Sequence, residues 1–269
     1  MGQKTFKRLS NKFSYFCQSL SGMFAIFRKE ISGFFSSLTG YIVIIVFLLV
    51  NSLFMWIFPG EWNILDSGYA GLDTLFFISP WVFLFLVPAV TMRMLAEEKR
   101  LGTIELLYSK PVTERGIILG KYFAAVTLVL LALIPCLIYY FSVYLLGETP
   151  GNLDAGGTWG AFIGLFFLAA IYASAGIFAS SLTDNQVIAF ILAVLICFVM
   201  YMGFEALAYL PGLKKFDEFV ISLGINEHYK SISRGVLDLR DAVYFIAVAA
   251  IFIEAARLVL VSRKWRKKS

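Results

Sequence analysis

Six stretches of this chain are each apolar over about 20 residues, the length that a helix needs to cross a lipid bilayer. This feature limits the fold more than any other, and the composition agrees with it. The chain is 59% hydrophobic and 15% charged, whereas a soluble domain carries about 25% charged residues. We therefore expect an all-α membrane protein with six transmembrane helices. The predicted spans are 41–58, 75–92, 122–146, 159–181, 187–209 and 242–261.

The spans read as one domain, because the sequence contains no low-complexity tract or internal repeat. We expect a transmembrane domain over 23–261, preceded by a cytoplasmic extension over 1–22 and followed by a basic tail over 262–269. The first apolar run begins only after about forty residues, which is not the pattern of a cleaved signal peptide. The chain is therefore expected to stay in the membrane whole.

The distribution of lysine and arginine predicts the orientation of the spans. The segments before the first span, between the second and third, and after the last carry 17 of these cations, and the opposite side carries five. Because cytoplasmic loops are enriched in lysine and arginine, both termini are expected in the cytoplasm. The net charge of +5 then reflects topology, and it gives no reason to expect nucleic-acid binding. The outer loops hold no cysteine that would form a disulfide.

The segment 93–121 is densely charged and is patterned as helix, turn and helix. Its ten charges would cost about 25 to 35 kcal/mol at the centre of a bilayer, so we expect the segment to lie in water. Gly102 is a plausible stop for the first helix, and Thr103 is placed to cap a short helix that Pro111 ends. Thr113 is placed to cap the next helix. Three apolar residues of the short helix suit insertion into a groove on another protein, namely Ile104, Leu106 and Leu107.

Two further segments are patterned as amphipathic helices. Before the first span, aromatic and aliphatic residues of 23–38 alternate with charges at helical spacing, which indicates a helix in the cytoplasmic interface. An ordinary cationic flank of the span is the alternative. After the fifth span, four apolar residues recur at i, i+3, i+4 and i+7, which favours a helix on the outer surface or dipping into the bilayer. The first set includes Phe27, Arg28, Lys29 and Glu30, and the second is Phe216, Phe219, Val220 and Leu223.

Small residues and prolines in the spans predict how these helices pack. Gly160 and Gly164 form a GxxxG pattern, which allows close approach of two helices. We favour packing within the chain, and a subunit interface is the alternative. Pro80, Pro88 and Pro135 remove backbone donors and are expected to kink the second and third spans.

A few isolated polar residues carry weaker predictions. Asp184 is placed to cap the fifth span, and Glu254 and Arg257 lie three residues apart, so they can pair. His228 is the only histidine, and we expect it to be solvated in the loop after the amphipathic pattern.

Catalysis by this chain is not expected. One histidine cannot supply an HExxH zinc site, and the spans show neither paired acidic motifs for a divalent ion nor a nucleophile beside a base. The sequence GIILGKY, which contains Gly116, Gly120 and Lys121, has three residues between its glycines where a phosphate-binding loop has four. We therefore expect no catalytic residue, cofactor or metal, and no ATP site.

The sequence EEKRLGTIELLYSKPVTERGIILGKY resembles the cytoplasmic loop of ABC-2-type transporter permeases, in which EE, GT.ELL, a proline and GK recur in this order. The resemblance runs from about Phe27 to Tyr209 and includes RKE, PAVTMRMLAEEK and ALIP. Within that superfamily the chain is most similar to the permease subunit of the gliding-motility-associated ABC transporter of Bacteroidetes, including the outer loop GEWNILD.

This resemblance implies a transmembrane subunit of an exporter in a bacterial inner membrane, paired with a second permease and with separate ATPase subunits. The short helix would be a coupling helix that lies in a groove of the ATPase, and the long outer segment would be an outer gate. The implied contact residues are Gly102, Thr103, Glu105, Leu106, Leu107 and Pro111, braced by Glu97 and Glu98. Leu38 and Thr39 depart from the serine-proline turn of the family. A membrane scaffold or assembly factor without transport is the alternative function, and a membrane enzyme is third.

Overall fold

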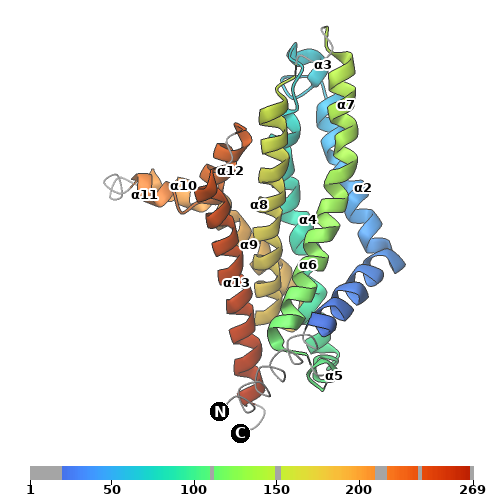
Figure 1. Ribbon diagram of the computed structural model, residues 1–269, viewed down its shortest axis with the longest axis vertical. Coiled ribbons are helices and arrows are strands. Elements are labelled where there is room, and N and C mark those ends of the chain that lie inside the picture. Colours follow the sequence, from blue (N-terminus) through green and yellow to red (C-terminus); the bar gives the residue numbers. More distant parts are fainter. Residues whose placement is uncertain (1–19, 110–111, 149–152, 210–216, 236–237, 267–269) are drawn as a thin grey trace, which may run out of the picture.

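The computed structural model describes residues 20–109, 112–148, 153–209, 217–235 and 238–266, and all regular structure in these ranges is helical. Six helical segments are long and apolar enough to cross a membrane, which confirms the predicted all-α architecture with six spans. Figure 1 shows them as an elongated bundle. The spans are α2 with the π-helical turn η1 (Leu38–Ser52, Leu53–Ile57), α4 (Asp73–Arg100), α6, η2 and α7 (Glu114–Leu133, Ile134–Cys136, Leu137–Leu146), α8 (Ala155–Leu182), α9, η3 and α10 (Gln186–Phe198, Val199–Gly203, Phe204–Ala208), and α13 (Leu239–Arg266).

Shorter helices lie at the two ends and on one side of the bundle. At one end, α5 (Ile104–Tyr108) lies near the helix over 20–36, and α3 (Ile64–Ser67) lies at the opposite end (Figure 1). Between α10 and α13, α11 (Asp217–Ile221) and α12 (Ile225–Ser233) lie partway along the bundle rather than at its tip.

The helix over 20–36 is separate from the first span, as the amphipathic interpretation predicted. It ends at Ser37, whose hydroxyl accepts a hydrogen bond from Thr39 N and so caps α2. A capping serine therefore makes the turn at the point where the sequence departs from the serine-proline pattern of the family.

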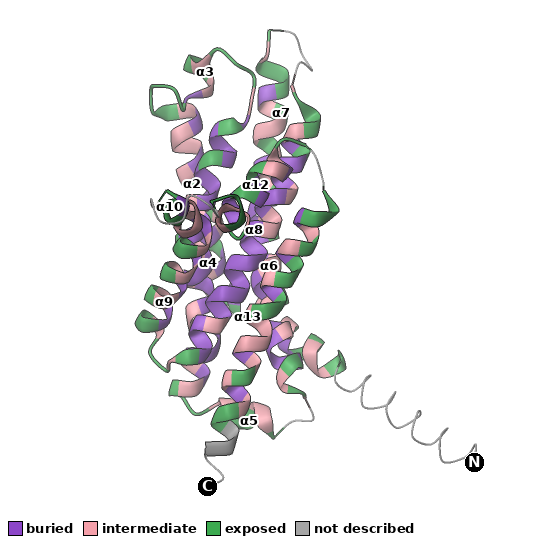
Figure 2. Cartoon of the chain, turned by 90° about the vertical axis from the view of Figure 1, so that its left-hand side faces the viewer, coloured by how far each residue is buried: buried purple, intermediate pink, exposed green. Residues whose placement is uncertain are grey.

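The fourth span, α8, is the centre of the bundle. In its apolar window 78% of the residues are buried, against 22–28% in α2, α9 and α13, and Figure 2 shows the buried residues concentrated along it. Its small residues permit this central position. A Cβ atom on Gly176 would lie 2.0 Å from Thr91 Oγ1 of α4, and one on Gly160 would lie 2.5 Å from Ile232 O of α12. Gly164 faces Tyr229 of α12, so the GxxxG pattern packs within the chain.

The prolines act differently in the two spans that contain them. Pro135 lies in the 3-10 turn η2, which separates α6 from α7, so the α-helical hydrogen bonding of the third span changes at this proline. Pro80 and Pro88 lie inside α4, which continues past both of them.

The predicted cap of the fifth span is wrong by one residue. Asn185, and not Asp184, accepts hydrogen bonds from Val187 N and Ile188 N, because Asn185 directly precedes the first helical residue. Asp184 instead accepts two hydrogen bonds of 2.7 Å from the guanidinium of Arg263. The expected pair of Glu254 and Arg257 is confirmed at 2.9 Å.

Candidate functional site

The loop between the second and third spans folds into the predicted short helix between two long ones. The first long helix, α4, continues to Arg100, and its end is closed by hydrogen bonds from Leu101 N to Glu97 O and from Gly102 N to Lys99 O. Gly102 has a φ of +70°, a conformation that glycine adopts without a steric penalty. This residue turns the chain into α5, as the sequence predicted.

The short helix α5 presents apolar side chains at its surface. Leu106 is 66% exposed, Leu101 and Glu105 are also exposed, and Ile104 and Leu107 are half-buried. The side chain of Thr103 does not cap this helix, since its hydroxyl donates to Glu98 O at 3.3 Å. Thr113 caps α6 as expected by accepting from Gly116 N at 3.1 Å. Pro111 lies outside the described residues.

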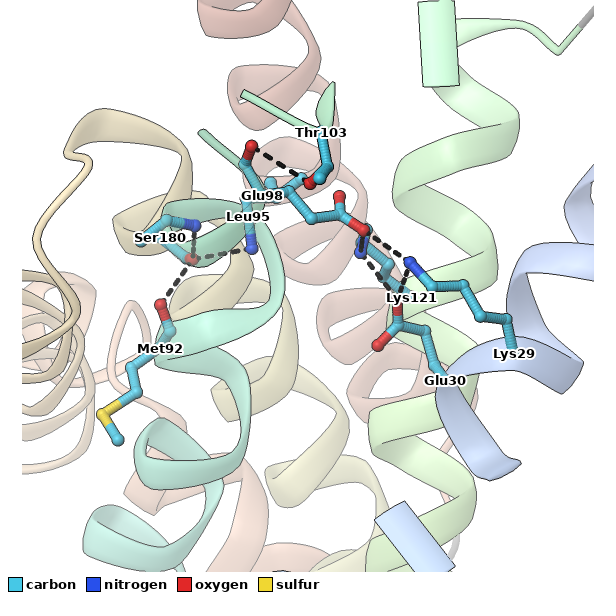
Figure 3. A network of polar contacts seen from close by, with 9 residues as sticks. Lys29, Glu30, Met92, Leu95, Glu98, Thr103, Lys121 and Ser180 are labelled. Atoms are coloured by element: carbon cyan, nitrogen blue, oxygen red, sulfur yellow. Dashed lines mark hydrogen bonds and ion pairs between the residues drawn. The ribbon is translucent and has the colours of Figure 1, made fainter. Parts of the chain in front are cut away.

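Beside this helix, four charged residues from three helices form a cluster (Figure 3). Lys121 of α6 donates to Glu30 Oε1 of the helix over 20–36 at 2.7 Å, and its Nζ lies 2.9 Å from Glu98 Oε1 of α4. Lys29 Nζ is also 2.9 Å from Glu98 Oε1. We call Lys29, Glu30, Glu98 and Lys121 the charge cluster. Its two cations and two carboxylates balance, which is the condition under which charges are tolerated away from water.

Burial differs strongly within the charge cluster. The Lys121 side chain is 1% exposed and Glu98 is buried, whereas Lys29 lies at the surface. Partial burial acts to lower the pKa of the Lys29 ammonium, but its hydrogen bond to Glu98 and the charges of Glu98 and Glu30 outweigh burial, so this pKa lies above its usual value. The second carboxylate oxygen of Glu98 has no hydrogen-bond partner among the described residues.

The expectation that the whole segment 93–121 lies in water is wrong for Glu98 and Lys121. An unpaired charge is costly in lipid, but these two charges pair inside the protein and so tolerate burial. Glu98 is therefore a buried member of the charge cluster, while Glu97 is half-buried. In the sequence, Lys121 belongs to the charged segment, to the failed match with a phosphate-binding loop and to the GK of the resemblance, and none of these predicts its burial. The signal for its role is a lone lysine that directly precedes a long apolar run.

Close packing holds the helix over 20–36 against α6 beside the charge cluster. A Cβ atom on Gly120 would lie 2.8 Å from Met23 O and 3.1 Å from Ile26 Cβ. The glycine before Lys121 thus lets the two helices approach closely enough for Lys121 to contact Glu30.

The end of α4 that leads into α5 is also hydrogen-bonded to α8. The Ser180 hydroxyl donates to Met92 O at 2.7 Å and accepts from Leu95 N at 3.1 Å and Ala96 N at 3.0 Å, so it inserts into the hydrogen-bond ladder of α4 (Figure 3). One turn further on, the Lys99 ammonium donates to Ser181 O. The end of α4 that leads into α5 is therefore connected by direct contacts to the centre of the bundle.

Within the described residues, the predicted outer helix ends at Ile221, before Leu223, and a second helix follows it. Phe219 and Leu223 are exposed and Val220 is half-buried, while Phe216 lies outside the described residues. The second helix, α12, was not predicted. The signal for it is the spacing of Ile225, Tyr229 and Ile232, which are all buried. His228 is 6% exposed, so the expectation that this histidine is solvated is wrong.

These features define a polytopic α-helical membrane protein with a short transverse helix between its second and third spans. The sequence profile described as "ABC-2 family transporter protein" matches residues 66–223, which is more than half of the chain. The chain therefore belongs to the ABC-2 transporter family and is a membrane permease subunit of an ABC transporter. A comparison with curated proteins finds no match.

Proposed function

We propose that this chain is the permease of an ABC exporter and that α5 receives movement from a separate ATPase subunit. The exposure of Leu106 supports this most directly, because a large apolar side chain at the tip of a short helix favours burial against a partner. The flanking residues Leu101 and Glu105 are also exposed. The matching groove on the ATPase would have an apolar floor and a cationic rim.

The charge cluster would carry the movement of α5 to the rest of the chain. Thr103 precedes α5 and bonds to Glu98 O, and Glu98 contacts Lys29 and Lys121. A displacement of α5 would thus reach the helix over 20–36, which leads into the first span, and α6, which is part of the third. Buried charge pairs resist separation, because parting them leaves a charge without a partner.

We propose that the chain pairs with a second permease, identical or homologous. The weak burial of α9 and of α2 within one chain leaves large apolar faces that lipid or a second copy would cover. Phe219, Val220 and Leu223, with Phe216 by its position in the sequence, are proposed to form the outer gate. On the resemblance of the GEWNILD loop, we place the transporter in gliding motility, in a bacterial inner membrane with both termini in the cytoplasm.

The docking role is tested by Leu106→Ser in the full-length chain co-expressed with the ABC ATPase subunits of the same organism. We expect loss of ATPase co-purification and of transport, with membrane insertion unchanged. Leu65→Ser on α3 is the matched control, since Leu65 is equally exposed at 66% but lies at the opposite end. Unchanged co-purification and transport in the Leu106 variant would contradict the assignment. If the wild-type chain binds its partners but never stimulates an ATPase, the protein is instead a membrane scaffold.

A further inference from the structure

The single histidine of the chain joins three segments between the fifth and sixth spans. His228 lies on α12, its Nδ1 is 2.7 Å from Asp241 Oδ1 of α13, and its Nε2 is 2.9 Å from Ser222 O, directly after α11. Its ring stacks on Tyr244, with centroids 3.8 Å apart. His228, Asp241 and Tyr244 lie outside the residues matched by the family profile, which end at 223, and Ser222 lies just inside them.

Both ring nitrogens face an oxygen atom, which limits the protonation states that fit. A carbonyl oxygen only accepts, and a neutral imidazole carries only one N–H. A neutral His228 beside an ionised Asp241 can therefore make only one of the two contacts as a hydrogen bond. With one additional proton on His228 or Asp241, both contacts are hydrogen bonds. That proton makes His228 an imidazolium, or it makes Asp241 an acid that donates to Nδ1.

The extra proton also concerns Asp241, which is buried beside His228. Asp241 is 5% exposed, and among the described residues only His228 forms an ion pair with it. An ionised carboxylate in this position would lack a cation if His228 were neutral, which is unfavourable in a buried site. Its second oxygen has no hydrogen-bond partner in the described part of the chain.

Other titratable groups around α12 do not replace His228 in this contact. On α12 itself, Glu227 is exposed and Lys230 pairs with Glu205 of α10 at 3.6 Å. The elements packed against α12 contribute Tyr172 on α8, Tyr201 on η3, and Asp241 and Tyr244 on α13, while α11 carries Asp217 and Glu218.

We propose that His228 and Asp241 form a proton-dependent clasp that holds the turn between α11 and α12 against α13. On loss of the proton, the remaining N–H stays on Nδ1 toward the carboxylate, as in serine hydrolase triads. A lone pair on Nε2 then faces Ser222 O, and this contact becomes repulsive. Deprotonation therefore weakens the hold of α13 on the turn after α11, where the Tyr244 hydroxyl still donates to Leu223 O at 2.6 Å, while α12 keeps its contact with α13. The clasp does not depend on the proposed ATPase coupling.

The position of α12 determines from which side of the membrane the pH acts on the clasp. Tyr229, the next residue, donates to Phe76 O near the beginning of α4 at 2.7 Å. The clasp thus lies near the ends of α4 and α13 that are remote from α5, and it responds to the pH on that side.

The test uses the full-length chain in lipid nanodiscs, purified with a tag that contains no histidine. Because the chain has one histidine, ring-¹⁵N labelling reports His228 alone, between about pH 5 and about pH 9. Amide hydrogen exchange of 217–224 is measured over the same range and corrected for the intrinsic effect of pH. We expect about tenfold faster exchange when the ring loses its second proton, which is the effect of one lost hydrogen bond.

Two variants and one control separate the clasp from a structural role. His228→Gln and Asp241→Asn are each expected to abolish the pH dependence of amide exchange in 217–224. If one of the two variants does not fold, the other still tests the clasp. Glu227→Gln on the same helix is expected to keep it. The proposal is overturned if both clasp variants retain the wild-type pH dependence, or if neither ring protonation nor exchange changes across the range.

Discussion

At the scale of single residues, Lys121 shows what local sequence patterns miss. The caps and stops around α5 depend on neighbours within a few residues, so Gly102 and Thr113 were predictable. The contact between Lys121 and Glu30 joins residues 91 positions apart, and no local pattern encodes it. The burial of His228 has the same origin, since its partner Asp241 belongs to another helix.

Replacing Lys121 with methionine should destabilise the protein strongly. The change keeps most of the side-chain volume but leaves Glu30 and Glu98 with only the exposed Lys29 as a counter-charge. We expect a loss of about 3 kcal/mol in the free energy of unfolding, since breaking a buried pair strands a charge. Denaturant titration of the chain in detergent micelles measures it.

Arg115→Met is the control for this substitution. Arg115 lies on the same helix and pairs with Glu254 at 2.8 Å, but both side chains are about half exposed. Exposed pairs contribute at most about 1 kcal/mol. Equal losses in the two variants would show that burial of the charge cluster has no energetic consequence.

The pair of Asp184 and Arg263 should give a small pH-dependent stabilisation. The two hydrogen bonds from Arg263 hold the pKa of Asp184 below its usual value. The stabilisation is therefore complete above the unfolded-state pKa of about 3.9 and is lost as the pH falls through the lower folded-state pKa. Asp184→Asn should cost less than about 1 kcal/mol at neutral pH. Thermal melts should show no difference between variant and wild type below both pKa values, and a constant difference would contradict the assignment.

At the scale of elements, the six spans were predictable because each needs only length and apolarity. The short helix α12 has only a weak signal in the spacing of its apolar residues, and the helix on which it packs could not be predicted. It packs on Gly160 and Gly164 of α8, and the GxxxG pattern of these glycines does not identify its partner helix.

Gly176→Ala should test how closely α4 and α8 are packed. The new methyl group would lie 2.0 Å from Thr91 Oγ1, so the helices must separate or Thr91 must change rotamer. Overpacking of this kind costs about 1 to 3 kcal/mol. Adding Thr91→Ala should recover part of the loss in the same unfolding measurement, because it removes the atom that clashes.

Gly33→Ala is the matched control for that substitution. Gly33 lies in the helix over 20–36 with nothing within 4 Å of the added atom. Alanine is a better helix former by up to about 1 kcal/mol, so this variant should be neutral or slightly stabilised. If Gly176→Ala were tolerated equally well, the close contact between α4 and α8 would not limit the packing.

At the scale of the whole molecule, the proposed docking surface and the charge cluster would be different parts of one mechanism. Leu106 is exposed at the tip, whereas Lys121 is buried where three helices meet, so a partner at the tip would contact the first and not the second. Docking and transmission should therefore be separable by mutation. This separation is the strongest test of the proposed function, because a scaffold needs docking only.

Glu30→Gln should uncouple the two processes. The amide keeps the shape of the side chain but removes one of the two carboxylates that bind Lys121, while α5 is unchanged. We expect normal co-purification of the ATPase with about tenfold slower transport, in contrast to Leu106→Ser, which should lose both. Transport into proteoliposomes and ATPase binding are measured on the same preparations. Parallel loss of binding and transport in the Glu30 variant would instead mean that the charge cluster only maintains the fold of the docking surface.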